Sequence, residues 1–210
     1  MDKGILLFDI DRTIFNTNKM SDIVDQEILK IIGIENEEKM KSIKEEYIKS
    51  LQRDREYTPQ AHMTLLAQAC NLANTDKLLE IYEGEKFSHI YKNSVYPETV
   101  EILETMQRSF RIGIYSEGNS KFQNHKFRSM DISSYFDEDL IFIVPAKDTK
   151  EVLDRIPVES IIVDDKEIIC DFLTDNSRRA IWLNRKDEVK SSKFETIYSL
   201  TELPSTLIGN

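Results

Sequence analysis

Residues 5–13 read ILLFDIDRT, and this stretch decides the fold. Four apolar residues lead into Asp9 and Asp11, a pattern typical of a buried strand with polar side chains at its end. Residues two apart in an extended strand project from the same face, so we expect the two carboxylates to lie in one small space. Neighbouring carboxylates repel each other unless a divalent cation or a proton offsets the repulsion. The stretch therefore predicts acid or metal chemistry at the end of the first strand.

The composition indicates a globular protein. The chain has 210 residues, of which 40% are hydrophobic, enough for a large domain or a core with an insertion. Its formal charge is −10, with no dense Lys/Arg run, which argues against nucleic acid as a partner. Cys70 and Cys170 lie far apart without a nearby His or Cys, and are interpreted as buried thiols in a reducing compartment. The first apolar run is too short for a signal segment or a membrane span, so we expect a soluble, cytoplasmic protein without a membrane partner.

The segment of residues 21–91 reads as helix without a convincing strand. Apolar residues recur there at helical spacing in four groups, and the short connections predict an antiparallel bundle of about four amphipathic helices. Gly33 is expected to end the first helix. Thr58 and Pro59 are expected to open the third, because threonine caps helices and proline suits the first helical position. Thr75 is the expected cap of the fourth helix, which should run unbroken to the end of the segment.

From residue 96 onward, helices and strands alternate, which predicts a parallel sheet covered on both faces. Further strands are expected at residues 112–115, 140–144, 160–163 and 180–183. Ser120 with Gln123 reads as a capping box, and Asp148 with Glu151 is expected to open another helix. Residues 197–203 are compatible with either helix or strand. The predicted fold class is α/β, with a Rossmann-like parallel sheet, helices on both faces, and an all-helical insertion after the first strand.

Polar residues follow three of the expected strands at the point where each strand ends. Asp9 and Asp11 follow the first strand, Ser116 the second, and Asp164 with Asp165 the fourth. Ligands of open parallel sheets bind at the carboxyl ends of the strands. The three groups together predict one site at this edge of the sheet.

These motifs carry a resemblance that spans nearly the whole chain. The stretches FDIDRT (8–13), IGIYSEG (112–118) and IIVDD (161–165) resemble the first, second and fourth motifs of the haloacid dehalogenase (HAD) superfamily of phosphoaspartate-forming phosphohydrolases. YPETVEILETMQ and YFD also lie where that family has similar residues. By its location, the helical block is similar to the family's C1 cap. The resemblance implies a core domain of residues 1–15 and 95–210 and a cap domain of residues 16–94.

The resemblance also implies a mechanism. Asp9 would be the nucleophile that forms an aspartyl phosphate, and Asp11 the acid that protonates the leaving alcohol and then the base that deprotonates water. Mg²⁺ would be the cofactor, held by Asp9, by a backbone carbonyl near Asp11, and by Asp164 and Asp165. Whether Asp164 or Asp165 contacts the metal directly stays open.

Further groups are implied for the phosphoryl oxygens. Ser116 and the backbone amides of Glu117 and Gly118 would bind them at a loop that enters a helix. The family also uses a lysine near its third motif. Lys147 is the candidate by position, and Lys150 and Lys126 are the alternatives.

The chain departs from the family's pattern at three positions. Arg12 stands where the second aspartate of the first motif is commonly followed by glycine, and Asp164 replaces the glycine of the frequent fourth motif. Asp148 stands where proline often follows the motif lysine. Arg12 is interpreted either as positive charge at the site entrance or as a solvent-facing residue.

Several functions fit these residues. The dehalogenase branch lacks the second aspartate because no leaving alcohol needs a proton, so Asp11 favours a phosphatase. A phosphomutase of the same superfamily and a non-catalytic or regulatory HAD-like protein are the alternatives. The expected substrate is a small phosphorylated metabolite, either a sugar phosphate or a nucleoside monophosphate, and the sequence carries no prediction of oligomeric state. Candidate substrate contacts in the cap are Tyr47, Arg53, Arg55, Tyr57 and His62.

Overall fold

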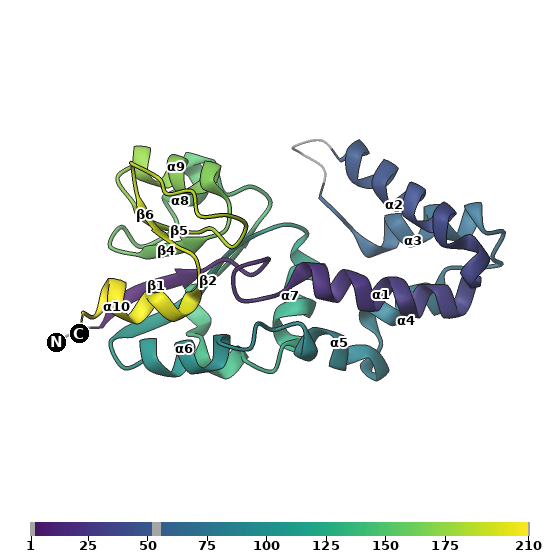
Figure 1. Ribbon diagram of the computed structural model, residues 1–210, viewed down its shortest axis with the longest axis horizontal. Helices are drawn as coiled ribbons and strands as arrows, with labels where there is room; N and C mark the ends of the chain where they lie inside the picture. Colours follow the sequence, from purple (N-terminus) through teal and green to yellow (C-terminus); the bar gives the residue numbers. More distant parts are fainter. Residues whose placement is uncertain (1–2, 52–55, 210) are drawn as a thin grey trace.

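The computed structural model describes residues 3–51 and 56–209 of the chain. Its sheet has six strands, all parallel, in the order β3-β2-β1-β4-β5-β6 (Figure 1). The strands are β1 (Gly4–Phe8), β2 (Phe110–Glu117), β3 (Ile141–Val144), β4 (Ile161–Asp164), β5 (Arg179–Leu183) and β6 (Glu195–Ile197). The predicted Rossmann-like parallel α/β fold is therefore confirmed.

Helices cover both faces of this sheet. Figure 1 shows α6 (Thr99–Met106) and α7 (Ser120–Ser129) below it, and α8 (Lys150–Leu153) and α9 (Glu167–Asp175) above it. The short helix α10 (Leu203–Leu207) packs in the same core as α6. The alternation of side chains along β1 produces two cores. Leu6 and Phe8 pack with the helices below the sheet, and Ile5 and Leu7 pack with those above it. Burial on both faces explains why β1 is apolar throughout and lies at the centre of the sheet.

The chain between β1 and α6 is helical. Its described residues form α1 (Thr17–Ile32), α2 (Glu37–Ser50), α3 (Pro59–Ala69), α4 (Asp76–Glu83) and α5 (Ser88–Asn93), with 3₁₀ turns at Ile34–Asn36 and Glu85–Phe87. In Figure 1 these helices extend to the right of the sheet. The expected unbroken fourth helix is wrong, because the chain becomes extended at Gly84 (φ −79°, ψ 136°) and separates α4 from α5. Glycine is a poor helix residue, and here that local preference decides the boundary.

Two predicted helix boundaries are confirmed. Gly33 follows the last residue of α1 with φ +86°, a conformation that glycine adopts without strain. Thr58 caps α3 through its side chain, which accepts the N–H of Ala61 at 3.3 Å. Thr75 precedes α4 as expected, but its side chain makes no capping hydrogen bond.

Two other capping predictions are wrong by one residue. Asn119, and not Ser120, caps α7 by accepting a first-turn N–H at 3.1 Å. Thr149, and not Asp148, caps α8 by accepting a first-turn N–H at 3.4 Å. Asn119 directly precedes the expected cap and Thr149 directly follows it, and both residue types accept the same capping hydrogen bond. The residue types alone therefore do not decide where the helix begins.

The C-terminal segment resolves the ambiguity left by its sequence. It forms the edge strand β6, a 3₁₀ turn at Leu200–Glu202 and the short helix α10, whose Leu203 is fully buried. The side chains of Ser199 and Glu202 form the reciprocal capping box that opens this turn. Other 3₁₀ turns lie at Ser133–Tyr135 and Glu138–Leu140.

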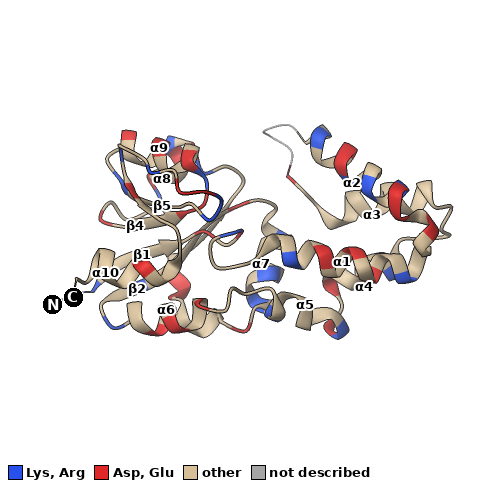
Figure 2. Ribbon diagram, in the orientation of Figure 1, with Lys and Arg blue, Asp and Glu red and all other residues tan. Residues whose placement is uncertain are grey.

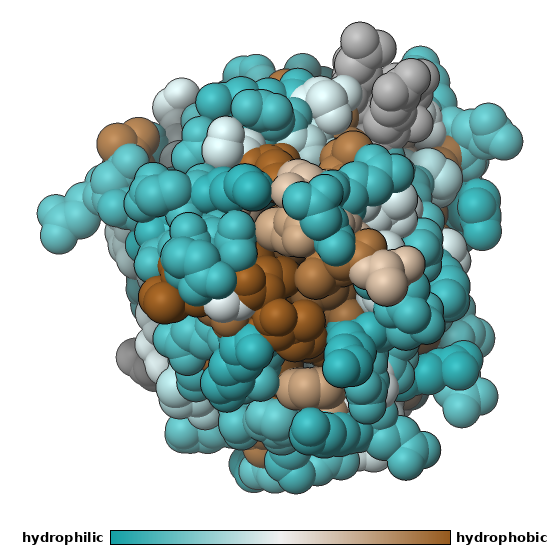
Figure 3. Space-filling view, turned by 90° about the vertical axis from the view of Figure 1, so that its right-hand side faces the viewer, coloured by the Kyte–Doolittle hydropathy of each residue, from teal (hydrophilic) through white to brown (hydrophobic). Residues whose placement is uncertain are grey.

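The surface carries charges of both signs (Figure 2), and the face shown in Figure 3 has an apolar area. Residues of both signs alternate along α2 (Figure 2). Figure 3 views the end formed by the inserted helices, where a hydrophobic area is surrounded by hydrophilic residues. No helix among residues 3–51 and 56–209 is both long and apolar enough to span a membrane. Both cysteines are free thiols, and Cys170 is buried as expected, whereas Cys70 is partly exposed.

Candidate active site

The two aspartates of the first motif lie in the turn after β1, not in the strand. β1 ends at Phe8, and the amide of Asp9 still donates to Val163 of β4 at 2.9 Å. Beyond it, the N–H groups of Thr13, Ile14 and Phe15 converge on the carbonyl of Ile10 at 3.3, 3.2 and 3.0 Å. The expectation that Asp9 and Asp11 share one face of an extended strand is therefore wrong. Because the chain turns between them, their carboxylates have different partners.

Asp9 is paired with a buried lysine. Lys147 Nζ lies 2.5 Å from Asp9 Oδ1 and 2.5 Å from Asp164 Oδ2, and all three residues are almost completely buried. Lys147 follows β3, Asp9 follows β1 and Asp164 ends β4, so the contact joins the carboxyl ends of three strands of the sheet. Of the three candidate lysines, it is the one that lies against Asp9. Lys150 is exposed on α8.

Three carboxylates form a group that could hold a metal ion. Within the described part of the chain, one oxygen each of Asp9, Asp164 and Asp165 lie within 4.8 Å of one another. Arg12 approaches Asp165 with Nη1 3.5 Å from Oδ2. With Lys147, two cations thus face three carboxylates. The remaining negative charge and the all-oxygen donors suit Mg²⁺, so the residues present fit the cofactor that the resemblance implies.

The side chain of Asp11 is not in this group. Its Oδ1 accepts from Thr17 Oγ1 at 2.6 Å and from Lys126 Nζ at 2.7 Å. Its Oδ2 accepts from Gln123 Nε2 at 2.7 Å and from the same lysine at 2.9 Å. The expectation of Asp11 as a metal ligand therefore rests on its backbone carbonyl and not on its carboxylate.

The two environments shift the aspartate pKa values in opposite directions. Burial, with Asp164 and Asp11 nearby, raises the pKa of Asp9 to about 7, although Lys147 opposes the shift. Burial acts in the same direction on Asp11, but Lys126 outweighs it and lowers the pKa of Asp11 to about 2. Burial and Asp164 also raise the pKa of Asp165. A cation bound to the three carboxylates would favour the ionised form of Asp9.

The second motif contributes one unpaired hydroxyl. Ser116 is 1% exposed, and its Oγ has no hydrogen-bond partner among the described residues. A buried hydroxyl without a partner is costly, which fits a ligand atom that pairs with it. The Gly118 amide donates to Val144 of β3 at 2.9 Å, so in this conformation it is not free for a phosphoryl oxygen. The Glu117 carboxylate accepts from the Lys147 amide at 3.0 Å and from Lys166 Nζ at 3.1 Å.

A second arginine holds the turn that carries the aspartates. Arg185 donates to the carbonyls of Arg12 at 3.2 Å and Thr13 at 3.1 Å. It also pairs with Glu98 at 2.8 Å and stacks 3.8 Å from the ring centroid of Tyr96. Arg12 itself has φ +61°, the left-handed conformation in which glycine is at ease. This backbone conformation explains why glycine is common at this position in the family, and here an arginine adopts it.

Three of the five candidate substrate contacts lie together. Tyr57 Oη lies 2.9 Å from His62 Nδ1 and 3.0 Å from Tyr82 Oη, and Tyr47 stacks on His62 with ring centroids 5.5 Å apart. The Tyr57 ring packs against Phe122 of α7 at 5.9 Å, so this aromatic cluster joins the inserted helices to the sheet domain. Burial lowers the pKa of His62 to about 4, which keeps it neutral. The other two candidates, Arg53 and Arg55, lie outside the described residues.

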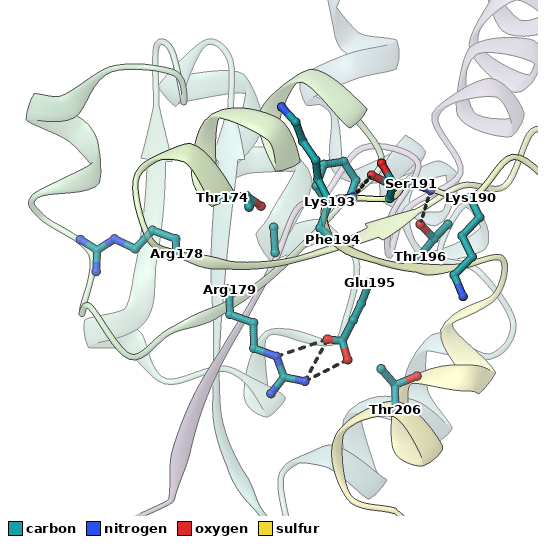
Figure 4. Close-up of a pocket in the computed structure, with 12 residues that line it drawn as sticks. Thr174, Arg178, Arg179, Lys190, Ser191, Lys193, Phe194, Glu195, Thr196 and Thr206 are labelled. Atoms are coloured by element: carbon teal, nitrogen blue, oxygen red, sulfur yellow. Dashed lines mark hydrogen bonds and ion pairs between the residues drawn. The ribbon is translucent and has the colours of Figure 1, made fainter.

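Two cavities differ in their relation to this site. One of about 450 Å³ lies between the inserted helices and α7, next to the aromatic cluster, and is lined by Thr58, Pro59, Gln60, Glu83, Asn119, Lys121, Phe122 and His125. A larger hollow of about 590 Å³ lies by β6 and the start of β5, away from the carboxyl end of β1 (Figure 4). Two cations on that surface are already paired, Arg179 with Glu195 and Lys193 with Asp171. The larger hollow is therefore not the candidate site.

Sequence reasoning missed four residues that hold the site. The sequence indicates only a capping role for Gln123. Lys166 directly follows Asp165, and this position could have suggested a role at the site. Arg185 lies two residues beyond the end of β5, a position that could have suggested a role at the carboxyl edge. Thr17 carried no signal, because its contact depends on the turn after β1.

The comparisons with known proteins identify the family. The family model for haloacid dehalogenase-like hydrolase matches residues 6–155, which is more than half of the chain. The parallel sheet and the acid group at its carboxyl edge agree with this class of protein. The chain belongs to the haloacid dehalogenase-like hydrolase family. A comparison with curated proteins found no match.

Solved structures with different activities share the fold. The putative HAD-hydrolase YfnB from Bacillus subtilis, bound to magnesium, is 17% identical, with a TM-score of 0.68 over 99% of this chain and 100% of that one. A HAD phosphatase from Thermococcus onnurineus is 22% identical, with a TM-score of 0.66 over 99% of each chain. L-2-haloacid dehalogenase from Xanthobacter autotrophicus is 13% identical, with a TM-score of 0.63 over 99% of each chain. At these identities the likeness defines the fold and leaves the reaction to the site residues.

Proposed function

We propose that this protein is a Mg²⁺-dependent phosphomonoesterase that acts on a small phosphorylated metabolite through an aspartyl phosphate on Asp9. The observation that carries the proposal is the group of Asp9, Asp164 and Asp165, with oxygens within 4.8 Å of one another. A dianionic phosphate monoester is repelled by three carboxylates unless a cation offsets their charge. Mg²⁺ bound to these three side chains and a backbone carbonyl near Asp11 would supply that charge and orient the phosphoryl group. The magnesium-bound YfnB structure, which has the same fold, supports this choice of metal.

The first chemical step forms a bond between an Asp9 oxygen and phosphorus and breaks the bond from phosphorus to the ester oxygen. Asp11 is ionised in the free protein, because Lys126 lowers its pKa to about 2, so it takes up one proton from solvent and passes it to the leaving oxygen. In the second step, Asp11 accepts a proton from water, the water oxygen attacks phosphorus, and the bond to Asp9 breaks. The products are the alcohol and inorganic phosphate, and Asp11 releases the proton that it took from water to solvent, so both aspartates return to their starting states. Lys147 would hold Asp9 for attack and offset charge on the phosphoryl oxygens, and the unpaired Ser116 hydroxyl would donate to one of them.

Asp11 favours a phosphatase over a dehalogenase. Halide ions are stable anions that leave without a proton, so a dehalogenase has no use for an acid next to the nucleophile. An alkoxide is a poor leaving group and needs one. Here the second carboxylate is present and held by four hydrogen bonds. Because solved dehalogenases share this fold, phosphatase and dehalogenase activity should both be tested.

We also propose that residues 16–94 form a cap that selects the substrate. The inserted helices meet the sheet domain at Tyr57 and Phe122, next to the cavity of about 450 Å³. A cavity of this size suits a small ligand, in line with a sugar phosphate or a nucleoside monophosphate. An interface between two domains is also a common place for a ligand site.

The test is product release from a panel of compounds, with Mg²⁺ and with EDTA. The panel contains sugar phosphates, nucleoside monophosphates, glycerol 2-phosphate, p-nitrophenyl phosphate and 2-chloropropionate. We expect phosphate release that needs Mg²⁺ and is lost in Asp9→Asn. Chloride release without phosphate release would identify a dehalogenase. Conversion of one sugar phosphate into its isomer without phosphate release would identify a phosphomutase, and retention of one phosphoryl group without turnover would identify a regulatory protein.

A further inference from the structure

Lys126 occupies an unusual position for a lysine. It lies on α7 and is 2% exposed, whereas Arg128 on the same helix is exposed. Its ammonium group lies 5.3 Å from the ring centroid of Phe15 and 5.0 Å from that of Phe122. The rings shield this cation from water, and its two hydrogen bonds go to the two oxygens of Asp11.

Stability alone does not explain this burial. Removing an ammonium group from water costs several kcal/mol, and replacing a buried ion pair by apolar residues of similar volume is often neutral or stabilising. Methionine, with nearly the same length, would fill the space between Phe15 and Phe122 without a charge. A lysine at this point therefore indicates a role for its charge and its hydrogen bonds.

The partners of Asp11 show what that role is. Thr17 from the start of α1 contacts only Oδ1, and Gln123 from α7 contacts only Oδ2. Lys126 is the partner that contacts both oxygens, so it resists rotation of the carboxylate about its own axis. Lys126 pairs with Asp11, whereas Lys147 pairs with Asp9 and Asp164. The site thus has one buried lysine for each of the two first-motif aspartates.

We propose that Lys126 is a positioning residue that acts through Asp11, fixing both carboxylate oxygens so that this group meets the leaving-group oxygen in one orientation. The inference rests on the proposed phosphohydrolase function and adds a residue that lies outside the motifs of the first, second and fourth strands. Loss of orientation at a proton-transfer group slows the chemical step, and a misplacement of about 1 Å can cost about 100-fold in rate. Substrate binding uses other residues and should change little.

The test measures kcat and KM for glycerol 2-phosphate in the full-length protein with Mg²⁺. We expect Lys126→Met to lower kcat by about 10-fold to 100-fold, with KM within about 2-fold of wild type. Lys126→Arg, which keeps the cation and its donors, should retain more activity than Lys126→Met. Arg128→Met removes one positive charge from the exposed face of the same helix and is the matched control, with kcat close to wild type.

A second set of variants separates positioning from a general structural role. In an Asp11→Asn background, Lys126→Met should lower kcat by less than about 2-fold more, because the group it positions is already disabled. Equal fold losses in both backgrounds would overturn the inference while leaving the phosphatase proposal intact. An unchanged kcat in Lys126→Met would also overturn it. A wild type that is inactive on every monoester would overturn the proposed function and this inference together.

Thermal unfolding tests the pair without reference to activity. Asp11→Asn leaves the buried ammonium group of Lys126 without its carboxylate, so this variant should melt below wild type. The double variant Asp11→Asn/Lys126→Met removes that stranded charge and should melt above Asp11→Asn. A double variant that melts below both single variants would contradict the coupling between the two residues and overturn the inference.

Discussion

Asp9 and Asp11 are two residues apart, yet each is neutralised by its own lysine. Lys147 comes from the loop after β3 and Lys126 from α7, so the two pairs are formed with different elements. As a consequence, the two aspartates differ in pKa. The pKa of Asp9 is raised to about 7, whereas that of Asp11 is lowered to about 2. Two carboxylates with different environments can take different roles in one reaction.

The raised pKa of Asp9 predicts a pH-dependent stability in EDTA. Unfolded Asp9 has the ordinary value of 3.8 and folded Asp9 a value of about 7, so between these values the folded state binds more protons. Stability from this group is therefore present below the unfolded pKa and is lost as pH rises through the folded pKa. The lowered pKa of Asp11 acts at more acidic pH and does not oppose this trend.

Asp9→Asn removes this titration while changing one side-chain atom. We expect the melting temperature of Asp9→Asn relative to wild type, both in EDTA, to be higher at about pH 8 than at about pH 5. Differential scanning fluorimetry at several pH values measures it. A constant difference across that range would contradict a raised pKa at Asp9.

The acid role of Asp11 predicts a dependence on the leaving group. Asp11→Asn should lower kcat/KM for glycerol 2-phosphate by about 10²-fold to 10⁴-fold, because its alkoxide needs a proton. The loss for p-nitrophenyl phosphate should be smaller, since p-nitrophenolate leaves as an anion. Steady-state kinetics with both substrates tests this. Equal losses for the two substrates would argue against proton donation by Asp11.

The backbone conformation of Arg12 predicts that a glycine variant is more stable than an alanine variant at this position, the reverse of the usual order. The φ of +61° at Arg12 strains any residue with a Cβ. The ion pair of Arg12 with Asp165 at 3.5 Å is lost in both variants and so does not affect their difference. Arg12→Gly should therefore be more stable than Arg12→Ala by about 1 kcal/mol, whereas glycine is usually the less stable of the two. Urea unfolding of both variants measures the difference. An alanine variant that equals or exceeds the glycine variant would contradict the strain.

At the scale of elements, the central strands were predictable because their residues are apolar on both faces. The strand ends were predictable only in part. The sequence led to Asp9, Ser116 and Asp164 at one edge of the sheet, since parallel strands end on the same side. The sequence did not predict β6, because its three residues are too few for an alternating pattern. It also did not predict the helix break at Gly84. The ion pair of Asp11 with Lys126 could not be predicted from the sequence, because it depends on which face of α7 packs toward the end of β1.

The packing of β2 gives a test at this scale. A Cβ at Gly113 would lie 2.4 Å from the carbonyl oxygen of Leu140 and 2.6 Å from Leu7 Cδ2, closer than van der Waals contact allows. Neither neighbour can withdraw, because one is backbone and the other is a fully buried side chain of β1. Gly113→Ala should lower the free energy of unfolding by about 1–3 kcal/mol or more, measured by urea unfolding. An unaffected stability would contradict this close approach.

At the scale of the whole molecule, the chain is a parallel sheet whose helical insertion begins directly after the turn that carries the aspartates. Asp11 therefore contacts both parts, through Thr17 of the first inserted helix and through Gln123 and Lys126 of α7. Composition and periodicity predicted the insertion and its position in the chain. The proposed boundaries at residues 16–94 and the choice of substrate depend on side-chain contacts across the interface, which periodicity does not describe.

The most direct test of the central claim is the covalent state of Asp9 during turnover. Wild-type protein is mixed with p-nitrophenyl phosphate, quenched in acid within the first turnovers and digested, and its peptides are weighed by mass spectrometry. With Mg²⁺ we predict one added phosphoryl group on the peptide that contains Asp9, absent in EDTA and in Asp9→Asn. Phosphate release without this adduct, or with the adduct on another residue, would contradict the account.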